Sequence, residues 1–224
     1  MSTSAFDRLR HLPPVFRLAD LCQLGSLAPK DASVMLHRWR QRGLVRALAP
    51  KAGVYFNLVA APDWRTHLET ALARTLPTAL RVGEGVLQQA GWTTQSEKAP
   101  AYAVLADGLH ARIDDVLLVD RPASWYAAVR QGDGVAPSRS AVPCLKPAWA
   151  LADALAFGDV WVPAPDDLYV DDSETAGFLR AWSALAPHAL LPEANSEDLF
   201  AEVYARIYET KTAEPKPRRM RLRR

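Results

Sequence analysis

Hydrogen-bond donors and cations recur on one side of a helix predicted over residues 29–42. A rotation of about 100° per residue turns these side chains outward: Lys30, Ser33, Val34, His37, Arg38 and Gln41, flanked by Arg40 and Arg42. Asp31 is the only carboxylate in this segment. Arginine can bind guanine and glutamine can bind adenine through paired hydrogen bonds, while cations neutralise phosphates. The pattern favours contact with DNA; the alternative is the ordinary solvated face of a small helical hairpin.

A hairpin predicted just after this helix extends the same chemistry. Its strands are Leu44–Leu48 and Val54–Leu58, and a turn at residues 51–53 joins them. Cations on such a hairpin can contact the phosphate backbone beside the helix. The candidate DNA-binding residues are therefore Lys30, Ser33, His37, Arg38, Gln41, Arg42, Arg46 and Lys51.

Acidic residues at two other places could bind metal or support catalysis, but both patterns are incomplete. Asp166, Asp167, Asp171 and Asp172 could supply oxygens to a divalent cation, yet no glycine-centred ligand loop accompanies them. Asp114-Asp115 precedes an apolar strand, as at the start of a nuclease site, but no Glu-x-Lys follows. We expect solvated loop charge at the first place and no nuclease at the second.

Other catalytic and cofactor motifs are missing from the sequence. The five histidines have no HxxxH or HxH spacing, and Gly83-Glu84-Gly85 lacks the third glycine of a dinucleotide loop. Ser138, Ser140 and Cys144 have no nucleophile-elbow motif around them. The expectation is a protein that is not an enzyme and that has no cofactor and no metal site.

Apolar residues must hold the cationic helix in place. Its inner side carries Ala32, Met35, Leu36, Trp39 and Gly43. These residues are predicted to pack on a shorter helix, Phe16–Leu24, through Phe16, Leu18 and Leu21. A turn at Gly25-Ser26 separates the two helices, Pro29 suits a first turn, and Gly43 suits the position after a last turn. The order helix–turn–helix–strand–turn–strand over residues 15–58 predicts a winged helix-turn-helix.

The rest of the chain is predicted to mix helices and short strands. Helices are expected at Ala5–His11, Trp64–Thr75 (capped by Asp63), Glu84–Ala90, Pro147–Phe157 (closed by Gly158), Ser173–Leu185 (capped by Ser173) and Ser196–Glu209. Strands are expected at 102–106, 110–113 and 116–119, joined by turns at 107–108 and 114–115, whereas 125–131 fits strand or helix. Four tryptophans fall in apolar helical phases and are expected in the core: Trp39, Trp64, Trp149 and Trp182.

The charges are segregated along the chain. Residues 1–62 carry a net +6, residues 63–210 a net −10 and residues 211–224 a net +6. A basic N-terminal part suits phosphate contact, whereas an acidic body suits a protein partner. We therefore predict an α+β protein with a winged helix-turn-helix at 1–62, a mixed domain at 63–209 and a disordered basic tail at 210–224. The tail is expected either to contact nucleic acid or to fold back on the acidic body.

The sequence also suggests where the protein works. No export signal and no apolar run of about 20 residues that could span a bilayer are recognisable. Cys22 and Cys144 form no disulfide framework and no CxxC pair, and the helical phase of Cys22 predicts a buried free thiol. A cytoplasmic location without membrane association is the simplest expectation.

Several segments in order resemble the AbiEi antitoxin family of type IV toxin–antitoxin systems. VFRLADLCQLG, ASVMLHRWRQRGLVRAL and GVYF, within residues 15–56, are similar to the family's winged helix. TALRVGEGVLQQAGW at 78–92 and AWALADALAFGDVWVPAPDDL at 148–168 are similar to two later helices of the family. Two departures are Trp39, where leucine is usual, and a longer turn over residues 48–53. Together the segments span about two-thirds of the chain.

The resemblance implies a specific role. Family members bind DNA through the winged module and repress their own operon, often cooperatively on inverted repeats, which implies a dimer on DNA. Their C-terminal domain, here an antitoxin-like α+β domain, counters a nucleotidyltransferase-like toxin from the neighbouring gene. Type IV antitoxins act without a stable complex with the toxin, but the acidic body here leaves direct contact open, so the toxin is countered directly or indirectly. The alternative is a regulator or protein-interaction module whose acidic C-terminal domain senses a ligand or binds a protein partner.

Overall fold

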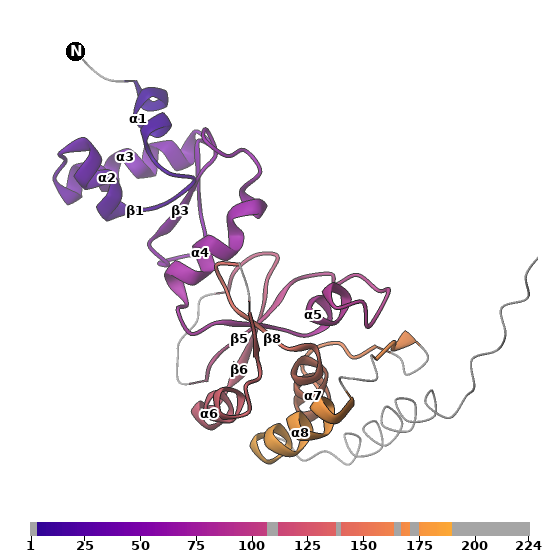
Figure 1. Cartoon of the computed structure of the whole chain (residues 1–224). Helices are drawn as coiled ribbons and strands as arrows, with labels where there is room; N and C mark the ends of the chain where they lie inside the picture. Colours follow the sequence, from indigo (N-terminus) through magenta and orange to yellow (C-terminus); the bar gives the residue numbers. More distant parts are fainter. Residues whose placement is uncertain (1–3, 107–111, 138–139, 164–166, 171–174, 190–224) are drawn as a thin grey trace, which may run out of the picture. The chain divides into compact units, whose positions relative to one another are not determined.

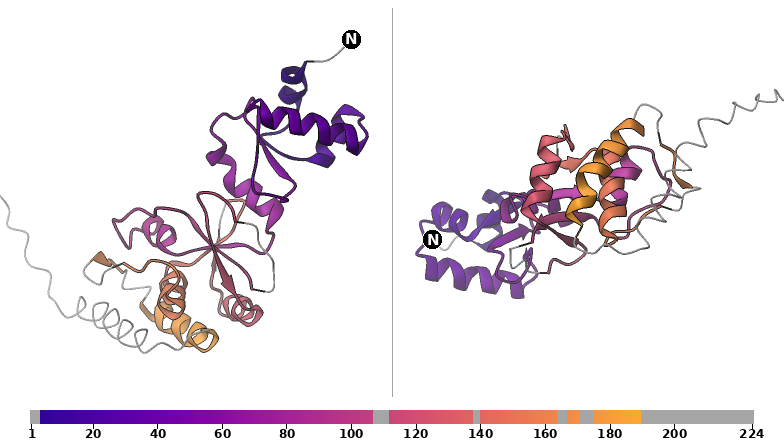
Figure 2. Two further views of the ribbon diagram at one scale, coloured as in Figure 1. Left: turned by 180° about the vertical axis from the view of Figure 1, so that it is seen from behind. Right: turned by 90° about the horizontal axis from the view of Figure 1, so that it is seen from below.

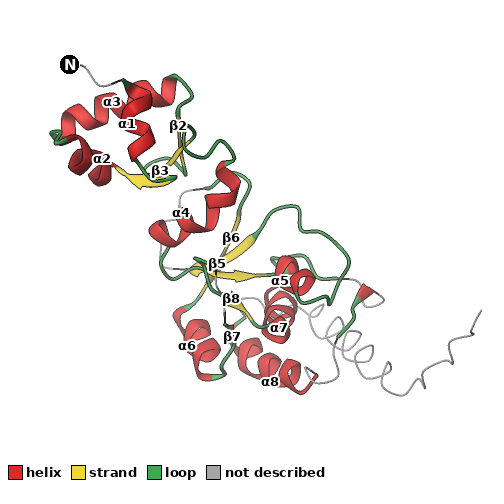
Figure 3. Cartoon of the chain, turned by 45° about the horizontal axis from the view of Figure 1, so that its top comes forward, coloured by secondary structure: helices red, strands yellow, loops and turns green. Residues whose placement is uncertain are grey.

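The computed structural model describes residues 4–106, 112–137, 140–163, 167–170 and 175–189 (Figure 1). Within these ranges the chain is α+β, as predicted, with eight α-helices and two β-sheets (Figure 3). None of the helices described is both long enough and apolar enough to cross a bilayer. Several predictions lie outside the described residues: the helix Ser196–Glu209, the tail 210–224, the strand residues 110–111, the turn at 107–108, the cap Ser173, and Ser138, Asp166, Asp171 and Asp172.

The chain forms two compact units, and it passes between them several times. Unit 1 comprises Met1–Arg81, Ala99–Ala123 and Ala136–Cys144, and unit 2 comprises Val82–Lys98, Ser124–Val135 and Leu145–Arg224. The boundary predicted at residue 62 stays a prediction.

The first elements of unit 1 follow the predicted order with one addition. They are α1 (Ala5–His11), β1 (Val15–Arg17), α2 (Leu18–Gly25), α3 (Pro29–Gln41), β2 (Val45–Ala47) and β3 (Val54–Asn57). The strands form an antiparallel sheet in the order β1-β3-β2. The addition is β1, so the prediction that Phe16 lies in the first helix is wrong: Phe16 pairs with Tyr55 of β3. The preceding Pro13-Pro14 favours extended backbone there.

One hydrophobic cluster joins the three N-terminal helices to this sheet. Its buried members are Leu9, Leu12, Phe16, Leu21, Ala32, Leu36, Trp39 and Val45. Cys22 packs against the cluster, but it is half-buried rather than fully buried as predicted, and its thiol is free.

Asn57 ties the end of α1 to the end of β3. The side chain is fully buried, and its amide nitrogen donates to the carbonyls of Leu9 at 2.7 Å and Leu12 at 3.0 Å. Its side-chain oxygen accepts from the backbone N–H groups of Val59 and Ala60, both at 3.2 Å. All the polar atoms of this side chain are therefore satisfied, as burial requires.

A second cluster of unit 1 continues past residue 62. The predicted helix at 64–75 begins as a 3₁₀ helix, Trp64–His67, and becomes α-helical in α4 (Leu68–Thr75). Asp63 caps it as predicted, accepting from the N–H of Arg65 at 3.2 Å. The buried residues of this cluster are Val15, Leu48, Ala49, Val54, Phe56, Trp64, Leu68, Ala71, Leu72, Ala79, Tyr102, Val104, Ile113 and Val142.

The second sheet has five short strands. They are β4 (Leu80–Val82), β5 (Ala101–Leu105), β6 (Leu117–Arg121), β7 (Val135–Ala136) and β8 (Cys144–Leu145), in the order β6-β5-β4-β8-β7. The predicted strands at 102–106 and 116–119 correspond to β5 and β6, which pair in parallel from Ala101–Leu117 to Leu105–Arg121. A parallel pair needs a longer connection than a tight turn. The turn predicted at 114–115 is present, with Asp115 at φ +61°.

Among the residues described, unit 2 contains four α-helices and a 3₁₀ helix at Ala186–His188. The α-helices are α5 (Glu84–Gln89), α6 (Ala123–Gln131), α7 (Pro147–Phe157) and α8 (Thr175–Leu185). The stretch 125–131, which fits strand or helix by sequence, is therefore helical. Gly158 closes α7 with φ +66°, as predicted. Residues 148–156 of α7 are all buried, as expected for a helix that is apolar on every side. α7 and α8 pack along each other in all views (Figures 1 and 2).

The tryptophans expected in the core are mostly there. Trp39, Trp64 and Trp149 are buried, and Trp182 is half-buried. Trp125, which was not singled out by its phase, is fully buried, and its indole N–H donates to Asp153 at 2.8 Å. Trp161 is 43% exposed.

Candidate nucleic-acid interface

The outer face of α3, together with Arg42 just after it, carries six of the eight residues predicted for DNA contact. Lys30, Ser33, His37, Arg38, Gln41 and Arg42 are all exposed. None of these side chains makes a hydrogen bond or ion pair to another described residue. We call this set the α3 face. It offers donors and positive charge directly to solvent.

The opposite side of α3 is buried as predicted. Ala32, Leu36 and Trp39 are 0%, 4% and 3% exposed, Met35 is half-buried, and only Gly43 departs from the prediction by being exposed. Because these side chains sit in the same cluster as α1, α2 and β2, rotation of α3 about its axis would expose apolar surface. The burial therefore fixes which side chains face outward.

Local backbone signals set both ends of α3. Pro29 occupies the first turn, where its missing N–H removes no helical hydrogen bond. At the other end Gly43 has φ +66°, and the N–H of Leu44 reaches back to the carbonyl of Trp39 at 3.0 Å. Such left-handed closure favours glycine. The preceding α2 ends on Ser26 at φ +47°, so the predicted turn is present, with serine in place of glycine at the strained position.

The β2–β3 hairpin lies next to α3 in sequence and carries the other two predicted residues. Arg46 pairs with Phe56 across the hairpin, and the connecting loop contains Lys51 at φ +62° and Gly53 at φ +69°. Lys51 is exposed at the tip and makes no hydrogen bond or ion pair to another described residue. It is therefore available to a phosphate group.

Arg46 differs from the other predicted residues because it already has partners. Its guanidinium forms an ion pair with Asp114 at 3.2 Å and lies 4.2 Å from the centroid of the Trp64 ring. Arg65 also lies over Trp64, at 4.9 Å, and forms an ion pair with Asp115 at 2.9 Å. We call these five residues the arginine–tryptophan cluster. A ligand phosphate would have to compete with Asp114 for Arg46.

Sequence reasoning missed this cluster. Asp114 and Asp115 were considered as the start of a nuclease site, whereas the structure pairs both with arginines. Arg46 and Asp114 are 68 positions apart in the chain. No local sequence pattern relates residues at that separation. The two consecutive aspartates in a predicted turn were the one sequence feature that indicated an ion pair with distant cations.

The predicted acidic patch is only partly described. Asp167 accepts hydrogen bonds from the hydroxyls of Thr93 at 2.8 Å and Thr94 at 3.1 Å. Burial, followed by the charges of Glu97 and Asp167, raises the pKa of Glu84. Among the residues described, no group of three or more His, Cys, Asp or Glu side chains could hold a metal ion.

Cys144 has little nucleophilic character. Burial raises the pKa of its thiol, and the positive charge of Arg81 opposes that effect only in part. The thiol therefore stays protonated near neutral pH, and the thiolate is the reactive form.

No protein-family model matches the chain, and a comparison with curated proteins gave no match.

Proposed function

We propose that residues 15–58 form a winged helix-turn-helix that binds double-stranded DNA, with α3 as the recognition helix. The observation that carries the proposal is the α3 face: six exposed hydrogen-bonding or basic side chains without partners among the described residues. Recognition helices present donors of this kind to base edges in the major groove.

The size of the elements supports this assignment. α3 has 13 residues, and a helix of that length extends about 20 Å. The major groove, about 12 Å wide, admits a single helix. α2 packs against α3, as the first helix of such a motif does, and the β2–β3 hairpin follows α3 directly. The combination gives one helix for base contact and one hairpin for the backbone.

The side chains of the α3 face suggest separate tasks. Arg38 and Gln41 can each make paired hydrogen bonds, to guanine and adenine respectively. Lys30, Arg42 and Lys51 suit phosphate contact, which positions the protein without reading sequence. Ser33 and His37 can donate hydrogen bonds to base edges or to phosphates. Arg46 joins the backbone contacts only after it leaves Asp114.

The test is binding of the full chain to DNA from its own promoter, followed by fluorescence anisotropy at several salt concentrations. Affinity should fall steeply as salt rises, because bound cations release counterions from DNA. Arg38→Gln should weaken binding by about tenfold or more, whereas Lys98→Gln, which removes an exposed cation of unit 2, should have little effect. Equal losses in the two variants, or binding that does not respond to salt, would show that α3 is not the interface.

The finer role is proposed from the family resemblance. We infer an antitoxin of a type IV toxin–antitoxin system that represses its own operon, binding inverted repeats as a dimer, and that counters a nucleotidyltransferase-like toxin through the residues after the winged module. The proposal requires a gene beside this one that encodes a nucleotidyltransferase-like protein, and co-expression of the two should restore growth to cells that the toxin arrests. A chain with Arg38→Gln should still restore growth but should no longer repress the promoter. Growth arrest that persists with the intact chain would exclude the antitoxin role.

A further inference from the structure

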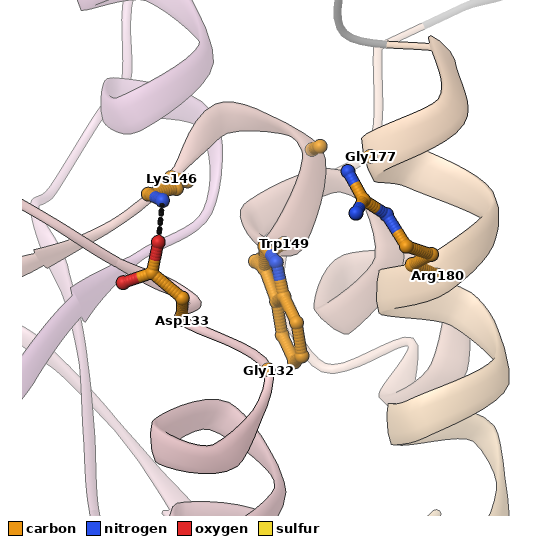
Figure 4. Close-up of a pocket in the computed structure, with 7 residues that line it drawn as sticks. Gly132, Asp133, Lys146, Trp149, Gly177 and Arg180 are labelled. Atoms are coloured by element: carbon orange, nitrogen blue, oxygen red, sulfur yellow. Dashed lines mark hydrogen bonds and ion pairs between the residues drawn. The ribbon is translucent and has the colours of Figure 1, made fainter.

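Unit 2 contains a pocket that DNA binding does not use. It lies between the loop after α6, the start of α7 and one side of α8, and its volume is about 340 Å³ (Figure 4). The lining residues are Gly132, Asp133, Lys146, Ala148, Trp149, Gly177 and Arg180. Pockets that hold small molecules start at about 300 Å³, so this one has room for a compact organic ligand.

Two glycines set the shape of this pocket. A Cβ atom at Gly132 would lie 2.2 Å from the Trp149 ring, and one at Gly134 would lie 2.6 Å from it. The indole therefore packs directly on bare backbone. Trp149 itself is 5% exposed, so its position is fixed by its surroundings before any ligand arrives. A preformed aromatic wall lowers the cost of ordering a bound ligand.

The pocket brings together two of the cations that the structure describes in unit 2. The structure describes four lysines and arginines in unit 2, namely Lys98, Arg130, Lys146 and Arg180, and two of them line the pocket. In Figure 4 the Trp149 ring lies between the Lys146–Asp133 pair and Arg180. The first turn of α7, which begins after Lys146, adds the positive end of a helix dipole.

Both cations are available to an anion. The Nε of Arg180 donates to the carbonyl of Ala176 at 3.3 Å, and no described carboxylate pairs with its guanidinium. Lys146 forms an ion pair with Asp133 at 2.5 Å, but the Asp133 side chain is 87% exposed. An ion pair so open to water is weak, and a ligand anion can join or replace it at little cost.

We propose that this pocket binds a small organic anion: a carboxylate or phosphate carrying a compact ring. Arg180 supplies a fork of donors suited to either anion, and Lys146 adds a second charge. The ring lies against Trp149. A bare inorganic anion would leave most of the volume unfilled. The proposal does not depend on DNA binding, since every residue in it belongs to unit 2.

The experiment titrates the full chain with phenyl phosphate and with benzoate, and follows the indole N–H signals by NMR. The chain has seven tryptophans, so the Trp149→Phe variant identifies the relevant signal. At least one probe should shift the Trp149 signal saturably, with a Kd of about 1 mM or below. Inorganic phosphate should bind more weakly, because it cannot reach the ring.

Three charge variants locate the site. Arg180→Gln should weaken binding about tenfold or more, because a charge-assisted hydrogen bond is lost. Asp133→Asn should tighten binding about two- to fivefold by releasing Lys146. Asparagine tolerates the left-handed backbone at this position, where φ is +54°. Arg130→Gln, an exposed cation on α6 that does not line the pocket, should leave binding unchanged.

Two results would overturn the proposal. One is the lack of a saturable Trp149 shift with both probes. The other is an equal loss in Arg180→Gln and Arg130→Gln, which would mean general charge attraction rather than a site. If inorganic phosphate binds as tightly as phenyl phosphate, the placement of a ring against Trp149 is wrong. Circular dichroism of each variant checks that the fold is retained.

Discussion

The α3 face and the arginine–tryptophan cluster use the same kinds of cation in opposite ways. Arg38 and Arg42 project from α3 without a partner among the described residues, whereas Arg46 and Arg65 stack on Trp64 and pair with two aspartates. Both sets belong to unit 1, and a sequence reading gives Arg38 and Arg46 equal standing. In the structure, the arginines of the α3 face are open to an external ligand, whereas those of the arginine–tryptophan cluster already contact other side chains.

This difference shows that an arginine binds an external ligand most readily when its guanidinium has no partner within the protein. A guanidinium that has found a carboxylate and an aromatic ring gives up both contacts when it turns to a phosphate. One without partners gives up only water. If unit 1 binds DNA, the α3 face should therefore dominate the affinity, and Arg46 should contribute only when Asp114 is removed.

The largest expected effect comes from the anchor beneath the α3 face. Trp39→Ala should lower the free energy of unfolding by about 3–5 kcal/mol, because a tryptophan that is 3% exposed leaves a cavity. DNA affinity should fall with it. Val34→Ala is the control, since Val34 lies on the same helix and is 46% exposed. Urea unfolding measures the free energy of unfolding of both variants. Similar losses would mean that α3 is not anchored through Trp39.

Gln41→Ala should have the next largest effect. It should lower the sequence-specific affinity for DNA and leave the stability of the fold unchanged. Loss of a paired hydrogen bond to adenine costs about 1–3 kcal/mol of binding free energy, so affinity for the promoter site should drop while affinity for unrelated DNA stays nearly constant. Competition anisotropy with both DNAs checks this. Gln23→Ala on α2 is also an exposed change and serves as the control. A uniform loss on all DNA would place Gln41 on phosphate instead of a base.

Asp114→Asn should strengthen DNA binding about two- to fivefold at low salt, because Arg46 is released from its 3.2 Å ion pair. The stability of the fold should change little, since exposed pairs contribute about 0–1 kcal/mol. The double variant Arg46→Ala/Asp114→Asn separates release of Arg46 from loss of a negative charge. If the gain survives in the double variant, Arg46 is not its source.

Lys51→Asn should have the smallest effect. Asparagine accepts the φ of +62° at this tip, so only the charge is removed. Binding should weaken to a similar degree on every DNA sequence, and the salt slope should fall by about 1. Unchanged slopes for all DNAs would exclude a phosphate contact at the hairpin tip.

The sequence predicted α3 well because its signals are local. Pro29 and Gly43 mark its ends, and the spacing of Ala32, Leu36 and Trp39 gives its inner side, so bounds and orientation both follow from neighbours in the chain. α7 was predicted on similar grounds, with Pro147 at its start and Gly158 at its end.

Features that depend on distant residues could not be predicted in this way. β1 has three residues, too few for a periodic pattern, and its partner β3 lies about 40 positions later in the chain. The parallel pairing of β5 with β6 and the capture of Arg46 by Asp114 are also set by the folded chain. The exposure of the α3 face and of Lys51 was therefore predictable, whereas the pairing of Arg46 was not.

The buried amide of Asn57 makes α1 and Leu12 a structural part of unit 1. A shortened chain that began after Leu12 would keep every residue of the α3 face. It would also leave two carbonyl partners of Asn57 missing, and a buried donor without an acceptor costs about 1–3 kcal/mol. Removal of Leu9 and Leu12 would open the apolar cluster as well. Anyone trimming or tagging this protein should treat α1 as structural.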